Sequence, residues 1–358
     1  EQRATRKESF MDIHTIIAMG RQTGCSDIHL SEGLPMLIRV KGRLEFAPIQ
    51  PGEEETRQMI LQMPDVWLQK EFSEGKDVDF AIQSPDGGRE RVNIFRQQGK
   101  LACTIRLLND RIPTIEELQL PPILKQLANE PRGLILVTGP TGSGKSTTLA
   151  AMIDYVNASR PEHIITIEDP IEYVYERKQA LIHQREVGRD VSSFAAALRS
   201  ALREDPDIIL VGEMRDYETI SAALTAAETG HLVFSSLHTT GAANTIDRII
   251  DACPASSQNQ VRIQLSGVLK GIVTQCLIPT ADGRGRTAAT EMLTGTDAVM
   301  NLIRESKGHQ MSTIMQSGAA NGMHTLNGDL ARLVSVGMIS RDNAYKYSND
   351  KRDLVNYI

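Results

Sequence analysis

The sequence contains few cysteines, no long apolar run and no excess of positive charge. Its four cysteines lie far apart and form neither a C-x-x-C pair nor the spacing of a four-cysteine zinc site, so we expect free thiols in a reducing compartment. No apolar run approaches the ~18 residues that a membrane span needs, which predicts a chain that is not integral to a membrane. The formal net charge of −6 argues against a general nucleic-acid binder, although a local basic channel is compatible with it.

The chain of 358 residues has room for two domains, and its 41% hydrophobic and 23% charged residues are typical of a globular protein. Residues 1–10 are polar and lack the apolar segment of a signal peptide, so we expect them to be a tag or leader that precedes Met11. Residues 11–110 alternate short strand and helix patterns, which predicts an α+β domain. A cluster of prolines marks residues 111–122 as the linker.

The most informative stretch runs from Gly133 to Thr148 and reads GLILVTGPTGSGKSTT. An apolar run, typical of a strand buried on both faces, leads into a complete G-x-x-x-x-G-K-[ST] motif, and apolar residues at helical spacing follow. In such a loop, backbone N–H groups and the positive end of the helix dipole face phosphates, a lysine reaches the β and γ phosphates, and a hydroxyl ligates Mg²⁺. We therefore predict a site for ATP and Mg²⁺ that is made of Gly139, Thr141, Gly142, Ser143, Gly144, Lys145, Ser146 and Thr147, with Ser146 on the metal.

After the linker, strands and helices alternate, which predicts an α/β domain over residues 123–358 with a largely parallel sheet. Besides the strand before the loop, strands are expected at 164–167, 180–183, 208–211 and 232–237. From about residue 256 the chain is expected to become mostly helical, with one long amphipathic stripe from Val261 to Cys276.

Acidic residues that follow apolar strands are candidates for metal binding and catalysis. Glu213 follows the strand at 208–211, and Glu172 closes an acidic cluster, EDPIE, after the strand at 164–167. Carboxylates at strand ends lie beside the ligand crevice of an open α/β sheet, and three acids in five residues favour a nearby cation such as Mg²⁺. An exposed acidic strand end or turn is the alternative interpretation.

Histidines and arginines supply further candidates. His231 and His238 bracket the strand at 232–237 and point to opposite faces, so they cannot bind one metal from that strand. His238 lies at the carboxyl end of the strand, where phosphate contacts are expected, while a structural role stays open for both histidines. The last strands of the first domain are rich in arginine and include Arg91 and Arg106. These arginines either form a solvated face of the sheet or have a functional role.

Together these blocks resemble the secretion ATPase superfamily, the hexameric motors of type II secretion and type IV pili. Residues 167–172 resemble its Asp box, residues 207–213 its atypical Walker B strand, and residues 231–239 its His box. The resemblance covers nearly the whole chain. It implies a RecA-like P-loop ATPase core, preceded by a smaller α+β, PAS-like N-terminal domain.

By this resemblance, Glu213 and Glu172 become the acids that support the metal and the attacking water, with Glu213 the first choice as the catalytic one. His231 and His238 become sensors of the nucleotide state. Arg91 and Arg106 become the N-domain arginines that approach the γ-phosphate, in a ring from the neighbouring subunit. The resemblance also implies a homohexamer at the cytoplasmic face of the inner membrane, which acts with a pilus platform protein and with other pilus motor ATPases.

Two features favour pilus retraction over assembly. Assembly and secretion motors usually carry a four-cysteine zinc module, which the cysteine spacing excludes here. Residues 298–305 read AVMNLIRE and are similar to the AIRNLIRE motif of retraction motors, with Val299 and Met300 at its isoleucine and arginine positions. An amphipathic helix with Leu302 and Ile303 packed inward is compatible with either motor.

Alternatives remain on sequence grounds. An accessory retraction motor, a pilus-assembly motor or a type II secretion ATPase belongs to the same chemical class. A nucleic-acid translocase with a RecA-like core conflicts with the net charge, and DNA-stimulated turnover would support it. A nucleotide switch that binds ATP without hydrolysing it, and acts as a binding module, would be supported if Glu213→Gln left turnover unchanged from the wild-type background.

Overall fold

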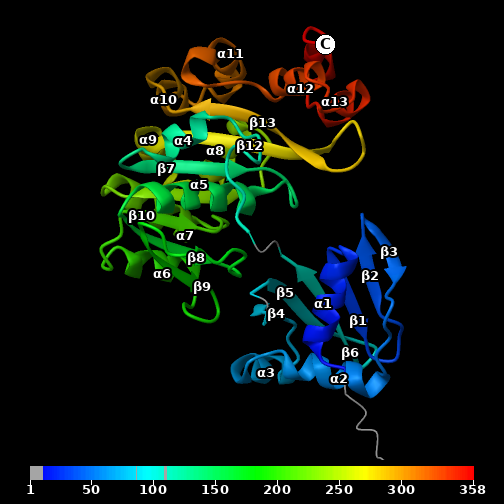
Figure 1. The fold of residues 1–358 in the computed structure, drawn as a ribbon. Coiled ribbons are helices and arrows are strands. Elements are labelled where there is room, and N and C mark those ends of the chain that lie inside the picture. Colours follow the sequence, from blue (N-terminus) through cyan, green and yellow to red (C-terminus); the bar gives the residue numbers. More distant parts are fainter. Residues whose placement is uncertain (1–10, 86, 109–110) are drawn as a thin grey trace, which may run out of the picture. The chain divides into compact units, whose positions relative to one another are not determined.

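The computed structural model describes residues 11–85, 87–108 and 111–358 (Figure 1), so the predicted tag or leader lies outside the described residues. The chain divides into two compact units, and each is described by itself. The first comprises Glu1–Arg111 with Pro170–Tyr173, and the second comprises Ile112–Asp169 with Val174–Ile358. No helix in the described part of the chain is both long enough and apolar enough to cross a membrane.

The first unit is built on an antiparallel sheet with the strand order β3-β2-β1-β6-β5-β4. Apolar and polar residues alternate along its strands, so that Ile28, Val92 and Ile105 are buried against Ile16 and Ile60 of the helices. The predicted α+β composition is confirmed. The elements are α1 (Ile13–Thr23), β1 (Asp27–Ser31), β2 (Leu37–Val40), β3 (Arg43–Phe46), α2 (Glu53–Gln62), α3 (Val66–Ser73), β4 (Val78–Gln83), β5 (Arg89–Gln97) and β6 (Lys100–Leu107).

The second unit is built on a seven-stranded sheet with the order β13-β12-β7-β11-β10-β8-β9. All neighbouring strands from β12 to β9 are parallel and β13 is antiparallel, which confirms the predicted parallel-rich α/β sheet. Its strands are β7 (Gly133–Thr138), β8 (His163–Glu168), β9 (Leu181–Glu186), β10 (Ile208–Val211), β11 (Leu232–Leu237), β12 (Leu269–Pro279) and β13 (Arg286–Thr294).

Helices cover both faces of this sheet, which explains why its central strands are continuously apolar. Helices α4 and α5 pack on the face that carries Ile135 and Phe234, whereas α6 to α11 pack on the face that carries Leu134 and Val233. The last helices pack on Ile278 and Ala289 of β12 and β13. The helices are α4 (Ile123–Ala128), α5 (Lys145–Ser159), α6 (Phe194–Ala201), α7 (Tyr217–Glu228), α8 (Ala242–Asp251), α9 (Gln258–Val268), α10 (Asp297–Arg304), η1 (Gly308–Gln310), α11 (Met311–Ser317), η2 (Ala319–Asn321), α12 (Leu326–Ser335), α13 (Arg341–Tyr347) and α14 (Lys351–Leu354).

The prediction of one helical stripe from Val261 to Cys276 is wrong. Helix α9 ends at Val268, and β12 begins at the next residue and pairs in parallel with β7 (Figure 1). A continuous apolar run fits a buried helix and a buried strand equally well, and β-branched residues at 272–274 favour the strand. The expected helix at 298–305 is confirmed as α10, which buries Val299, Leu302 and Ile303.

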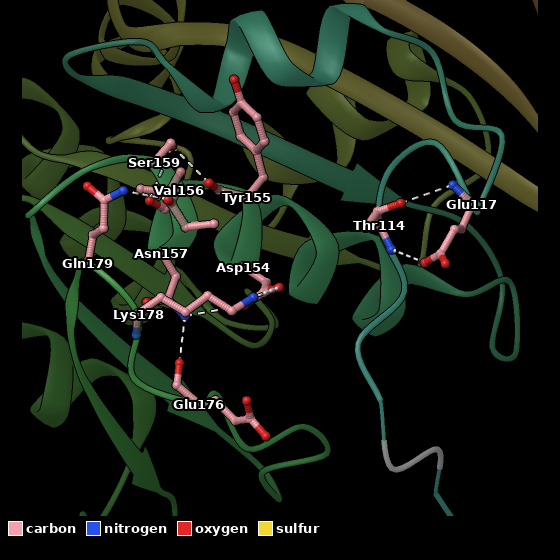
Figure 2. Close-up of polar contacts among 11 residues, drawn as sticks. Thr114, Glu117, Asp154, Tyr155, Val156, Asn157, Ser159, Glu176, Lys178 and Gln179 are labelled. Atoms are coloured by element: carbon pink, nitrogen blue, oxygen red, sulfur yellow. Dashed lines mark hydrogen bonds and ion pairs between the residues drawn. The ribbon is translucent and has the colours of Figure 1, made fainter.

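Polar contacts fix helix α5 to the segment that leads into β9 (Figure 2). Asn157 donates to the Glu176 carbonyl at 2.8 Å and accepts from the Lys178 N–H at 3.3 Å, and the Lys178 amine contacts Asp154 at 2.7 Å. In the predicted linker, Thr114 and Glu117 bond to each other's backbone N–H groups. The contacts of Asn157 and Lys178 therefore tie the helix that carries the phosphate loop to the segment before β9, and those of Thr114 and Glu117 close a local turn.

Candidate nucleotide site

The predicted order of strand, loop and helix is confirmed at the phosphate loop. All six residues of β7 are buried, and α5 begins at Lys145 directly after the loop. Gly139, Gly142 and Gly144 have φ values of 142°, 77° and 90°, which side-chain-bearing residues rarely adopt. A Cβ at Gly139 would also collide with the carbonyl oxygen of Gln275. The loop therefore requires glycine for its backbone conformation and for its close contact with β12.

The side chains of the loop differ in exposure. Lys145 is only 8% exposed, and its Nζ donates to the carbonyl oxygens of Gly139 at 2.9 Å and Pro140 at 3.1 Å. Ser146 is exposed and Thr147 is half-buried. The lysine thus lies folded over the loop, where its charge is solvated by carbonyls that phosphate oxygens can replace.

His238, at the carboxyl end of β11, is brought to the loop as its position predicts. Its Nδ1 lies 3.4 Å from Lys145 Nζ and 3.4 Å from Thr141 Oγ1. On its other side, Nε2 lies 3.5 Å from Glu213 Oε2. One imidazole therefore connects the lysine of the loop with the acid at the end of β10.

Glu213 occupies a fixed position beside this histidine. The backbone around it is held by neighbouring strands, because Gly212 donates to the Ile167 carbonyl at 2.8 Å and accepts from Ser236 Oγ at 2.6 Å. Its Oε1 contacts Arg215 at 2.6 Å, whereas its buried Oε2 has His238 Nε2 at 3.5 Å as an ion-pair neighbour and, among the described residues, accepts no hydrogen bond. A buried carboxylate oxygen without a hydrogen bond is costly, so this atom fits a bound water or a metal ligand.

The oxygen donors at the loop suit Mg²⁺, which prefers hard oxygen ligands and keeps several waters. The hydroxyl of Ser146 and the carboxylate of Glu213 supply such donors from α5 and from the end of β10. The groups present therefore fit a phosphate-bound magnesium ion.

Comparisons with known proteins identify the family. A model of the type II/IV secretion system protein family matches residues 101–345. The chain belongs to this family.

Relatives of this secretion-system protein match nearly its whole length. The type IV pilus retraction ATPase PilT of Pseudomonas aeruginosa is 51% identical over 93% of this chain and 97% of its own. The twitching motility protein of Neisseria gonorrhoeae is 47% identical over 93% of this chain and 89% of its own. A crystal structure of the pilus retraction motor PilT with bound ADP has a TM-score of 0.89 and 46% identity, and covers 97% of this chain and 99% of that one. The predicted family, RecA-like fold and ATPase class are confirmed, and the names of these relatives agree with the predicted retraction type.

Three other predicted site residues belong to the first unit, and their roles stay predictions. Arg91 on β5 and Arg106 on β6 are direct cross-strand neighbours. Arg91 contacts Asp79 at 2.6 Å, and Arg106 contacts Asp27 at 2.9 Å. Glu172, which is half-buried, lies in the segment Pro170–Tyr173 that groups with this unit.

His231 is not brought to the loop of its own chain. It precedes β11, where its Nδ1 contacts the Ala226 carbonyl at 2.9 Å, and the loop follows the opposite ends of the parallel strands. A six-residue strand spans about 20 Å, so the two histidines of the predicted His box lie at opposite edges of the sheet. Its predicted role as a nucleotide sensor stays a prediction.

Sequence patterns missed several residues at the site. Gln275 of β12 and Thr148 of α5 lie beneath the loop, and Arg215 contacts Glu213.

A pocket of about 400 Å³ beside the loop is lined by Thr147, Gln275 and other residues of β12 and β13. The only sequence signal for Gln275 is an amide inside an apolar strand. A larger cavity of about 920 Å³ is lined by parts of α4 and α12 and includes no residue of the loop.

A buried glutamate anchors the helix that follows the His box. Glu291 of β13 is 7% exposed and accepts the N–H of Ala242, the first residue of α8, at 2.8 Å. Burial raises the pKa of Glu291 above its usual value, although the N–H groups of Ala242 and Leu326 counteract this in part. Glu291 therefore positions α8, but its burial costs free energy of folding, and this cost increases when the carboxyl ionises.

We expect Glu291→Gln to be relatively more stable at pH 8 than at pH 5. A carboxyl whose pKa is higher in the folded protein than in the unfolded chain favours folding while it is protonated. This contribution to stability is complete below the pKa of the unfolded chain, and it is lost as the pH rises through the pKa of the folded protein. Glutamine retains an oxygen for the Ala242 N–H and cannot ionise. The difference in melting temperature, variant minus wild type, should therefore be more positive at pH 8 than at pH 5. Circular dichroism melts at both pH values measure this. Glu218→Gln, at an exposed position of α7, is the control, and a pH-independent difference for Glu291→Gln would contradict the expectation.

Proposed function

We propose that this chain hydrolyses Mg-ATP to power the retraction of type IV pili. The observation that carries the proposal is the grouping of Lys145, His238 and Glu213 at the carboxyl ends of β7, β11 and β10. The names of the relatives support retraction rather than another output.

The residues at the loop have separable roles in this proposal. Lys145 exchanges the carbonyls of Gly139 and Pro140 for phosphate oxygens, while the loop N–H groups and the start of α5 bind the same charge. Ser146 would ligate Mg²⁺ directly and Glu213 would support it through a bound water; the ion would supply charge neutralisation at the phosphates. Glu213 accepts a proton from the attacking water through its buried Oε2, with Arg215 holding the other oxygen in place. Glu172 is proposed as the second acid that supports the metal and water.

We further propose a homohexamer as the working assembly. In a ring, Arg91 and Arg106 reach the γ-phosphate that a neighbouring subunit binds. Their positive charge stabilises the transition state of phosphoryl transfer. ATP would thereby control how adjacent subunits dock. The proposed parts are residues 11–110, a linker at 111–122 and a motor domain at 123–358. The ring acts on an inner-membrane platform protein at the cytoplasmic face, together with other pilus motor ATPases and without nucleic acid.

The test is a count of surface pili on cells whose only copy of this chain carries Glu213→Gln. We expect an excess of pili that do not retract in live imaging, because assembly continues while disassembly is blocked. Cells without pili would show that the chain powers assembly instead. Unchanged pilus number and retraction would reject both motor functions.

A further inference from the structure

Gln275 is a buried amide that lies directly beneath the phosphate loop. It belongs to β12, which pairs with β7, the strand that leads into the loop, and it is 2% exposed. Its Nε2 donates to the Ser143 carbonyl at 2.7 Å, and its Oε1 accepts from Thr148 Oγ1 at 2.8 Å. One side chain therefore joins the last turn of the loop to the first turn of α5.

The bond to Ser143 controls the direction of a peptide group. The Ser143 carbonyl and the Gly144 N–H belong to one planar trans peptide unit, so the two groups point in opposite directions. While Gln275 holds the carbonyl on the β12 side, the N–H points away from β12 and into the loop. A flipped peptide would instead present a carbonyl oxygen to a bound phosphate.

The loop backbone does not fix this direction by itself. Gly144 has a φ of 90°, a region in which glycine moves between conformations at little cost, so an external contact has to select one of them. Gln275 is itself immobilised. Its partner across the strands is Thr290 of β13, whose N–H and hydroxyl donate to Asp329 of α12 at 2.8 Å and 3.1 Å. These contacts fix the backbone beside Gln275, and the bonds of its amide to Ser143 and Thr148 fix the side chain, so the amide can support the peptide above it.

We propose that Gln275 is a positioning residue that holds the Ser143–Gly144 peptide in its phosphate-binding orientation and so sets the affinity of the loop for nucleotide phosphates. The inference rests on the proposed nucleotide function and adds a residue outside the loop motif. Gln275 contacts neither phosphate nor water in this scheme, so its effect falls on nucleotide binding and not on the chemical step.

The sharpest test is Gln275→Glu. At pH 8, which favours ionisation of a buried acid, the carboxylate still accepts from Thr148, but it repels the Ser143 carbonyl and attracts the N–H of the flipped peptide. We expect Mg-ADP, measured by titration calorimetry, to bind about 10- to 100-fold more weakly, the range for a buried acceptor that loses its donor. In ATPase assays, KM should rise by a similar factor while kcat changes less than about threefold. Gln275→Met, which removes both hydrogen bonds at similar volume, should weaken binding less than Gln275→Glu because it does not favour the flip.

Thr274→Val is the matched control. Thr274 precedes Gln275 on β12, and its hydroxyl bonds with Thr138 of β7 at 2.8 Å, so the change removes a buried hydrogen bond between the same two strands without touching the loop. We expect a lower melting temperature with unchanged Mg-ADP affinity. Equal losses of affinity in Thr274→Val and the Gln275 variants would show a general effect of strand packing and would overturn the proposal.

The remaining outcomes distinguish a failure of the role proposed for Gln275 from a failure of the proposed nucleotide function. Wild-type affinity in both Gln275 variants overturns the role of Gln275 and leaves the nucleotide site intact. If Gln275→Glu does not fold, a wild-type affinity of Gln275→Met alone overturns it. Absence of Mg-ADP binding by the wild-type chain would instead reject the proposed function itself.

Discussion

Replacement of Glu213 by glutamine should slow ATP turnover by at least ~100-fold while nucleotide binding is retained, given the usual effect of losing a general base. Glutamine has the shape of glutamate and keeps an oxygen for Arg215, so the segment after β10 should hold its position. It lacks the basic oxygen that accepts a proton from water. Phosphate release under saturating Mg-ATP measures turnover, and calorimetry with Mg-ADP measures binding.

The control for this variant is Glu228→Gln, the same substitution at the exposed last residue of α7, where glutamine keeps an oxygen for Gln264. Its turnover should stay within about twofold of wild type, because Glu228 lies at the opposite end of α7 from the segment that carries Glu213. Near-normal hydrolysis by Glu213→Gln would move the catalytic role to Glu172. Glu172→Gln would then be expected to show the 100-fold loss. If all three variants and the wild type hydrolyse ATP at the same rate, that rate is a background rate. The chain would then act as a nucleotide switch.

The parts of the fold that sequence predicts are those encoded locally. The strand at β7, the glycines that need positive φ and the first turn of α5 are consecutive in the chain, so their pattern determines both structure and chemistry. The parallel sheet also follows from local alternation of strands and helices. His238 and Glu213 were predictable at the site because each follows the carboxyl end of a parallel strand.

Contacts between distant segments are what the sequence could not supply. Strand β12 joins the sheet beside β7, which lies more than a hundred residues earlier in the chain, and its apolar run by itself fits a helix equally well. The position of Gln275 under the loop depends on that pairing and on its register. Arg91, Arg106 and His231 show a different limit, because roles that involve a neighbouring subunit are not encoded in the contacts of one chain.

Replacement of Lys145 by alanine should abolish most of the affinity for nucleotide. A charge-assisted contact between an ammonium group and phosphate contributes more than a neutral hydrogen bond, and Lys145 is the cation that the loop itself supplies. We expect Mg-ADP to bind about 100-fold more weakly, measured by calorimetry. The same loss should appear in thermal melts, where saturating Mg-ADP raises the melting temperature of the wild type and not of the variant.

The nucleotide-dependent part of the melt is the decisive quantity, because Lys145 also donates to the carbonyls of Gly139 and Pro140. Loss of these contacts is expected to lower the melting temperature without added nucleotide as well. Lys346→Ala, at an exposed position of α13, controls for the loss of one positive charge and should retain the full increase with Mg-ADP. Unchanged binding in Lys145→Ala would remove the phosphate-loop assignment, and the roles derived for Glu213, His238 and Gln275 would lose their basis with it.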